Sequence, residues 1–175
     1  MKYTQVALGL GAALLVQTAL LRMIASGQAP VDLVLVVVVY TALSRGPAAG
    51  VWTGTAAGLL QDVLSGGIVG VSGLAKCLTG AVVGLSGTRF FVGHSVSRFF
   101  TYLAASLLHA VCFFGVYMLI DTGAPAASGA FLLTQAVVNG VAGVIGVWLL
   151  RTAPGALRRL WQHVTPFSHG RWVIQ

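Results

Sequence analysis

The sequence predicts an all-α integral membrane protein built as a compact bundle of six transmembrane helices. Hydrophobic residues make up 57% of the 175 residues and charged residues only 7%, whereas soluble domains carry about 25% charged residues. Long apolar runs also recur along the chain, separated by Gly, Pro or charged residues. Each helical crossing needs about 20 residues. We therefore expect one membrane domain over residues 1–150 and a basic amphipathic tail over residues 151–175.

Six apolar runs are candidates for the crossings: 4–21, 31–44, 47–65, 70–88, 99–120 and 131–150. The first follows Lys2 as a signal peptide would, but it lacks a small-x-small cleavage site before a polar segment, so we predict a membrane helix. The second run spans only ~21 Å at 1.5 Å per residue, less than the ~30 Å hydrocarbon core. Its ends therefore require a thinned bilayer or shelter from neighbouring helices.

Helix-breaking residues separate the runs. Pro30 precedes the second run, Gly46 and Pro47 open the third, and Ser65-Gly66-Gly67 closes it. Proline disfavours helix at the preceding residue and is well placed at a helix start. The longest polar connection is 89–98, and Gly123-Ala124-Pro125 separates the last two runs.

Basic residues predict the orientation. Alternating connections place eight of them on one side, against Arg22 alone on the other: Lys2, Arg45, Arg89, Arg98, Arg151, Arg158, Arg159 and Arg171. The positive-inside rule then puts both termini in the cytoplasm. The acidic residues Asp32, Asp62 and Asp121 fall at the outer ends of the second, third and fifth helices.

Small residues form stripes at helical spacing on three of the predicted helices. Such stripes let helix backbones approach closely, so we predict packing roles for Gly50, Gly54, Gly58, Gly80, Gly84 and Gly140. The alternative is that one stripe faces another membrane protein.

The segment from Gln61 to Lys76 is the most specific polar feature. Asp62 lies about one turn before the outer end of the third helix, and Lys76 about one turn after the predicted helix start at Ser72. We therefore expect Asp62 and Lys76 at similar depth, near enough to pair, because paired charges are less costly near hydrocarbon. The alternative is that each reaches interfacial water separately. Ser72 is a candidate N-cap.

The remaining polar residues suggest no catalytic site. His109, with Ser106 one turn before it, and Asn139 lie within predicted helices and are more typical of interhelical hydrogen bonds than of a solute path. Cys77 and Cys112 lie in apolar runs and form no metal or disulfide motif. We expect no catalytic residue, no cofactor and no metal site.

The tail carries an amphipathic pattern beside basic residues. Leu157, Leu160, Trp161 and Val164 recur at helical spacing, with Arg158 and Arg159 between them. Arg158, Arg159 and Trp161 are expected at the membrane surface, where basic residues meet anionic lipid. Contact with a cytoplasmic partner is the alternative.

Several blocks resemble the bacterial rod shape-determining MreD family. These are Ala29-Pro30-Val31-Asp32-Leu33, the Gly50–Gly58 stripe, Gly58-Leu59-Leu60-Gln61-Asp62-Val63-Leu64-Ser65-Gly66-Gly67, Gly70-Val71-Ser72-Gly73-Leu74-Ala75 and Val138-Asn139-Gly140. The family typically shows Gly-x-x-x-Asp-x-x-Ser-Gly and then Leu-Gly. This chain has Val69-Gly70 at the second position, and Lys76 where an apolar residue is common.

The resemblance implies a fold similar to the substrate-binding subunits of energy-coupling-factor transporters, in the bacterial inner membrane. It also implies a non-enzymatic scaffold of the cell-wall elongation complex, acting with MreC as direct partner and with MreB, RodA and a class B penicillin-binding transpeptidase. Asp62, Ser65, Gly66, Gly67 and Lys76 would then form a structural turn or a partner-binding surface. No nucleic acid is expected to bind.

The sequence leaves two other functions open. A small-solute-binding subunit of a vitamin-type transporter predicts a closed pocket lined by Asp32, Asp62 and Asp121. An intramembrane protease would need Ser65 and His109 together, but they fall at different predicted depths with no third activating group.

Overall fold

A computed structural model describes residues 10–17, 31–86, 95–120 and 128–164, with side chains up to residue 149. Every regular element in these ranges is a helix, which confirms the predicted all-α class. A helical segment over residues 10–17 is followed by α2 (Leu33–Arg45), α3 (Pro47–Ser65), α4 (Val71–Ser86), α5 (Ser95–Ile120) and α6 (Gly129–Val164). The chain divides into two units after Val144.

The short α2 lies at the centre of the first unit. It has 13 residues, so it is about 20 Å long. Val34, Val38 and Ala42 on one face are fully buried. Residues 10–17 pack on this face through Ala13 and Leu14, together with Ala57 of α3. Neighbouring helices therefore shelter this helix, as its length requires.

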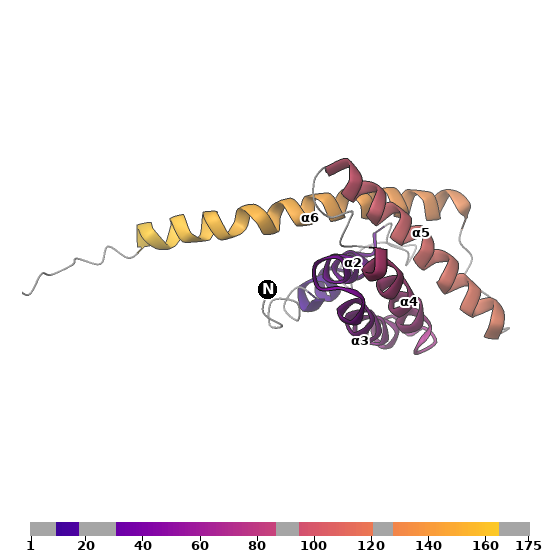
Figure 1. Cartoon of the computed structure of the whole chain (residues 1–175). Coiled ribbons are helices and arrows are strands. Elements are labelled where there is room, and N and C mark those ends of the chain that lie inside the picture. The colour runs from indigo at the N-terminus through magenta and orange to yellow at the C-terminus, as the bar shows by residue number, and fades with distance from the viewer. Residues whose placement is uncertain (1–9, 18–30, 87–94, 121–127, 165–175) are drawn as a thin grey trace, which may run out of the picture. The chain divides into compact units, whose positions relative to one another are not determined.

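The hairpin of α3 and α4 packs beside α2, and α5 runs along α4 (Figure 1). Gly46, at φ 90°, separates α2 from α3, and Pro47 occupies the first turn of α3. Proline fits there because the first helical N–H groups need no partner within the helix. The predicted bounds of the third run match those of α3, and those of the second and fourth differ from α2 and α4 by one or two residues.

α6 differs from the prediction at its end. The sixth apolar run was expected to end at residue 150, but α6 runs without a break from Gly129 to Val164 and so extends into the predicted tail. The structure does not describe the side chains of Arg158, Arg159 and Trp161. Asp121 and Arg89 also lie outside the described residues.

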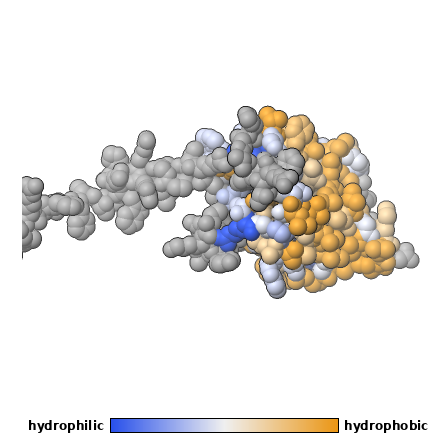
Figure 2. Space-filling view, in the orientation of Figure 1, coloured by the Kyte–Doolittle hydropathy of each residue, from blue (hydrophilic) through white to orange (hydrophobic). Residues whose placement is uncertain are grey.

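Two helical stretches in the described ranges are long and apolar enough to cross a membrane: Ser95–Ile120 and Gly129–Leu149. α2 and α4 are shorter apolar helices. Many large apolar side chains on the outer faces of α3, α4 and α5 are exposed, including Trp52 and Leu85 at 76%. Figure 2 shows the described surface as largely hydrophobic on the face in view. This surface fits insertion into a bilayer.

Candidate functional site

A buried ion pair joins α2 to α4. Lys76 Nζ donates to Asp32 Oδ2 at 2.7 Å, and Lys76 is 0% and Asp32 4% exposed. The predicted pairing of Lys76 with Asp62 is therefore wrong. Asp32 and Asp62 were both expected at the outer side of the membrane. Only Asp32 belongs to the central helix α2, which the Lys76 side chain contacts.

His109 of α5 completes the charged centre. Its Nε2 lies 3.3 Å from Lys76 Nζ. A lysine ammonium only donates hydrogen bonds, so His109 Nε2 accepts and the ring proton is assigned to Nδ1. Lys76 thus has two partners on two different helices. An ion pair with further hydrogen bonds is the arrangement that offsets the cost of removing charges from water.

The network continues into α6 through an amide. The backbone N–H of Asp32 donates to Asn139 Oδ1 at 2.8 Å. Asn139 Nδ2 donates to Ser106 Oγ of α5 at 2.9 Å. Asn139 is 1% and Ser106 5% exposed. These residues therefore make the interhelical hydrogen bonds that the sequence suggested.

The same residues satisfy the buried N-terminus of α2. The first N–H groups of a helix have no partner within it. Asp32 Oδ1 accepts from Leu35 N at 2.9 Å, and Gln17 Oε1 accepts from Val34 N at 3.2 Å. The Asp32 carboxylate also stands at the positive end of the helix dipole. We call Gln17, Asp32, Lys76, Ser106, His109 and Asn139 the polar cluster.

Asp62 does not pair with Lys76, and its carboxylate contacts the turn between α3 and α4 instead. It is 3% exposed, and its Oδ2 accepts from Gly70 N at 2.8 Å and from Ser72 N at 3.1 Å. A carboxylate at the end of α3 therefore caps the start of α4, as an N-cap side chain would. The prediction of Ser72 as N-cap is wrong, because α4 begins at Val71 and the cap comes from Asp62.

The turn after Asp62 is tight and exposed. Gly66, at φ 69°, ends α3 in the left-handed conformation and donates its N–H to the carbonyl of Asp62, as Gly67 does at 3.2 Å. Glycine adopts this conformation without steric cost. Ser65 Oγ donates to the carbonyl of Gln61 at 2.7 Å. Residues 63–69 are all exposed, so this turn lies on the surface of the molecule.

The predicted glycine stripes lie where helices touch. A Cβ on Gly50 would stand 2.5 Å from the carbonyl oxygen of Gly80, and one on Gly54 2.5 Å from that of Lys76. A Cβ on Gly58 would meet Gly73, and one on Gly84 would meet Pro47. The α3 and α4 backbones are therefore in contact from Pro47 to Gly58 on α3 and from Gly73 to Gly84 on α4. On α6, Gly140 faces the Phe99 ring of α5.

The residues that sequence reasoning missed are Gln17 and the partnership of Asp32 with Lys76. A signal for the pair existed, since Asp32 and Lys76 were both assigned to the outer ends of their helices. The only sign of a role for Gln17 was that it is a polar residue within an apolar run. Among the described side chains, no group of three His, Cys, Asp or Glu residues could hold a metal ion.

Apolar outer faces, two stretches of membrane-spanning length and charges paired between helices define a helical protein suited to a membrane. The comparison with family models gives the particular family. The model described as rod shape-determining protein MreD matches residues 6–152, so the chain belongs to the MreD family. No curated protein and no solved structure matches the chain. Membership supports a role in determining rod shape.

Proposed function

We propose that this chain is a non-enzymatic scaffold of the cell-wall elongation complex, with MreC as its direct partner. MreB, RodA and a class B penicillin-binding transpeptidase belong to the same complex. The match to the MreD family over residues 6–152 is the observation that carries this proposal. The fold proposed with it is a six-helix bundle of the energy-coupling-factor substrate-subunit type, with both termini in the cytoplasm of the bacterial inner membrane.

The interior of the bundle supports a scaffold. The polar cluster connects residues 10–17, α2, α4, α5 and α6. The glycine contacts hold α3 and α4 together over most of their length. A bundle fixed in this way presents outer surfaces of constant shape, which a scaffold requires.

The α3–α4 turn is the proposed partner surface. It is exposed, it carries the apolar side chains Ile68 and Val69, and Val69 is 62% exposed. Asp62, Gly66 and Gly67 fix its backbone from within. Under the proposed orientation it faces the periplasm, where it would contact MreC.

The test replaces Val69 with Arg in a rod-shaped bacterium that depends on this protein. Val69→Arg should keep membrane levels normal, reduce recovery of MreC with the purified protein, and produce rounded cells. Ala48→Arg, exposed at the other end of the hairpin, is the matched control and should leave both unchanged. Normal shape and full MreC recovery with Val69→Arg would reject the turn as the partner surface. Normal shape after complete removal of the protein would reject the scaffold role itself.

The transporter-subunit alternative gains no support from Asp32 and Asp62, the two acidic residues that the structure describes. Asp32 is engaged by Lys76, and Asp62 by the backbone of Gly70 and Ser72. Neither carboxylate is available to bind a solute without breaking a buried contact.

A further inference from the structure

The α3–α4 turn carries backbone N–H groups that have no acceptor among the described residues. Most N–H groups of the turn donate to the carbonyl or the carboxylate of Asp62: those of Gly66, Gly67, Gly70 and Ser72. The N–H groups of Ile68 and Val69 have no such bond within the described part of the chain. Both residues are exposed, at 37% and 62%. Because a backbone N–H requires a hydrogen-bond partner, these two groups can donate to another molecule.

The hydroxyl of Tyr117 lies beside this turn. A Cβ on Gly67 would stand 3.9 Å from Tyr117 Oη, so α5 reaches the turn. Tyr117 is only partly buried, and its hydroxyl makes no hydrogen bond to any residue that the structure describes. We call Ile68, Val69 and Tyr117 the donor surface.

Contacts inside the bundle hold both parts of the donor surface. The Tyr117 ring packs on Phe113 with ring centroids 5.0 Å apart, and Phe113 packs on His109 at 6.0 Å. His109 belongs to the polar cluster and lies 3.3 Å from Lys76 of α4. Asp62 fixes the turn itself. The donors are therefore preorganised, which reduces the entropic cost of binding a partner.

Neutral acceptors fit the donor surface better than anions. The carboxylate of Asp62 accepts from the N–H of Gly70, the residue after Val69, so an anion bound at Val69 would meet a like charge. Residues 63–72 contain no Lys or Arg. The exposed side chains of Ile68 and Val69 are apolar. An extended peptide supplies neutral carbonyl groups together with apolar side chains.

We propose that the donor surface binds an extended peptide segment of the partner protein through the carbonyl groups of that segment. This inference rests on the proposed function, because it takes the α3–α4 turn as the partner surface. It adds the chemistry of recognition, and it adds Tyr117 of α5 to the surface. Main-chain hydrogen bonds give affinity in such complexes, and side-chain contacts give specificity. Ile68 and Val69 supply those contacts here.

The first experiment adds purified MreC to the full chain in detergent and follows backbone hydrogen exchange residue by residue. Exchange at Ile68 and Val69 should slow at least about tenfold in the complex, because each N–H gains an acceptor. Exchange at Gly66, whose N–H already donates to the carbonyl of Asp62, should change less.

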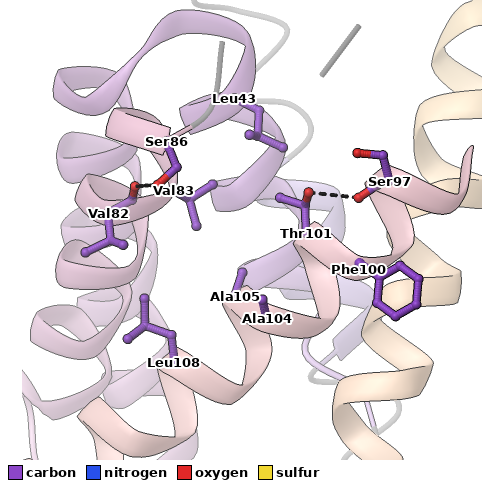
Figure 3. A pocket seen from close by; sticks show the side chains of 10 residues that line it. All are labelled: Leu43, Val82, Val83, Ser86, Ser97, Phe100, Thr101, Ala104, Ala105 and Leu108. Carbon is purple, nitrogen blue, oxygen red and sulfur yellow. Dashed lines mark hydrogen bonds between the residues drawn. The ribbon is translucent and has the colours of Figure 1, made fainter. Parts of the chain in front are cut away.

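The second experiment removes the hydroxyl of Tyr117 and keeps the ring. Tyr117→Phe should weaken MreC binding about fivefold, the effect of one neutral hydrogen bond, and leave thermal stability unchanged. Ser86→Ala is the matched control and should bind MreC normally. Ser86 is exposed at the other end of α4, donates to the carbonyl of Val82, and lines a separate cavity of about 440 Å³ between α2, α4 and α5 (Figure 3).

Three outcomes would overturn this inference and leave MreC as the partner. These are unchanged exchange at Ile68 and Val69 in a complex that has formed, full affinity in Tyr117→Phe, and equal losses of affinity in Tyr117→Phe and Ser86→Ala. If MreC does not bind the unaltered chain at all, the proposed partner is rejected and this inference with it. The two kinds of failure are therefore distinguishable.

Discussion

Lys76 shows how much about the contacts of a single residue could be predicted from the sequence. Its charge within an apolar run predicted a nearby carboxylate at the same depth, and the structure has one. The identity of that carboxylate depended on which helix lies at the centre. Asp62 was the nearer candidate along the chain, but its side chain is held by the backbone of Gly70 and Ser72. The short distance along the chain favoured Asp62, which belongs to the same hairpin as Lys76. In the folded protein α2 packs against α4, so Asp32 is the partner of Lys76.

The ion pair predicts a stability pattern across the wild-type protein and three variants. Lys76→Met leaves Asp32 buried without its partner, and breaking a buried pair costs about 3–5 kcal/mol. Asp32→Asn combined with Lys76→Met removes both charges and should cost clearly less than the sum of the two single changes. Denaturation of the purified protein in detergent measures all four. Additive losses would show that the two side chains do not interact.

Asp62 predicts a smaller and more local effect. Asp62→Ala removes the cap of α4 and should cost about 1 kcal/mol of unfolding free energy, within the 0.5–2 kcal/mol of N-cap losses. Asp62→Asn keeps one carbonyl acceptor and should lose less. Hydrogen exchange at Gly70 and Ser72 should rise in Asp62→Ala while exchange in α2 stays unchanged. Faster exchange throughout the bundle would contradict a capping role.

Among the elements, α3 and α4 were the most predictable. Their glycines recur at helical spacing, and the residues that break the helices mark both ends of α3. α6 was less predictable, because its apolar run ends at residue 150 whereas the helix continues through Pro154 to Val164. Proline removes one hydrogen bond and often kinks a helix, but it does not have to end one.

The α3–α4 contact predicts a severe effect of adding one methyl group. In Gly54→Ala the new Cβ would stand 2.5 Å from the backbone oxygen of Lys76, so the helices must separate. Overpacking of this kind typically costs about 1–3 kcal/mol. Gly115→Ala, where nothing lies within 4 Å, should be neutral or slightly stabilising because alanine favours helix. Equal thermal stability of the two variants would contradict the close backbone contact.

For the whole molecule, the all-helical class followed from hydropathy, whereas the number and direction of the crossings remain proposals. Hydropathy measures how apolar a segment is. Two of the described helical stretches are apolar enough and long enough to cross a membrane. α2 is too short to pass, yet it is the most completely surrounded helix. The burial of α2 by neighbouring helices depends on tertiary contacts, so a hydropathy window along the sequence cannot detect it.

The proposed orientation predicts a labelling pattern. With Cys77 and Cys112 replaced by Ala, single cysteines are introduced at Ile68, in the exposed α3–α4 turn, and at Ser44, exposed near the other end of the bundle. A membrane-impermeant maleimide added to intact cells should label Ile68→Cys and not Ser44→Cys. Both should react once the membrane is permeabilised. The reverse pattern in intact cells would invert the topology.

The ion pair between Asp32 and Lys76 also constrains the biosynthesis of the protein. The two residues are 44 positions apart, and α2 leaves the ribosome before α4. In the proposed six-helix bundle α4 crosses the bilayer, where an unpaired lysine costs about 3 kcal/mol, so α4 gains from finding the Asp32 carboxylate already in place. The order of synthesis thus supplies the acceptor before the donor. A circularly permuted gene that produces α4 first should give the same final bundle in lower yield, with more of the nascent chain lost at the insertion step.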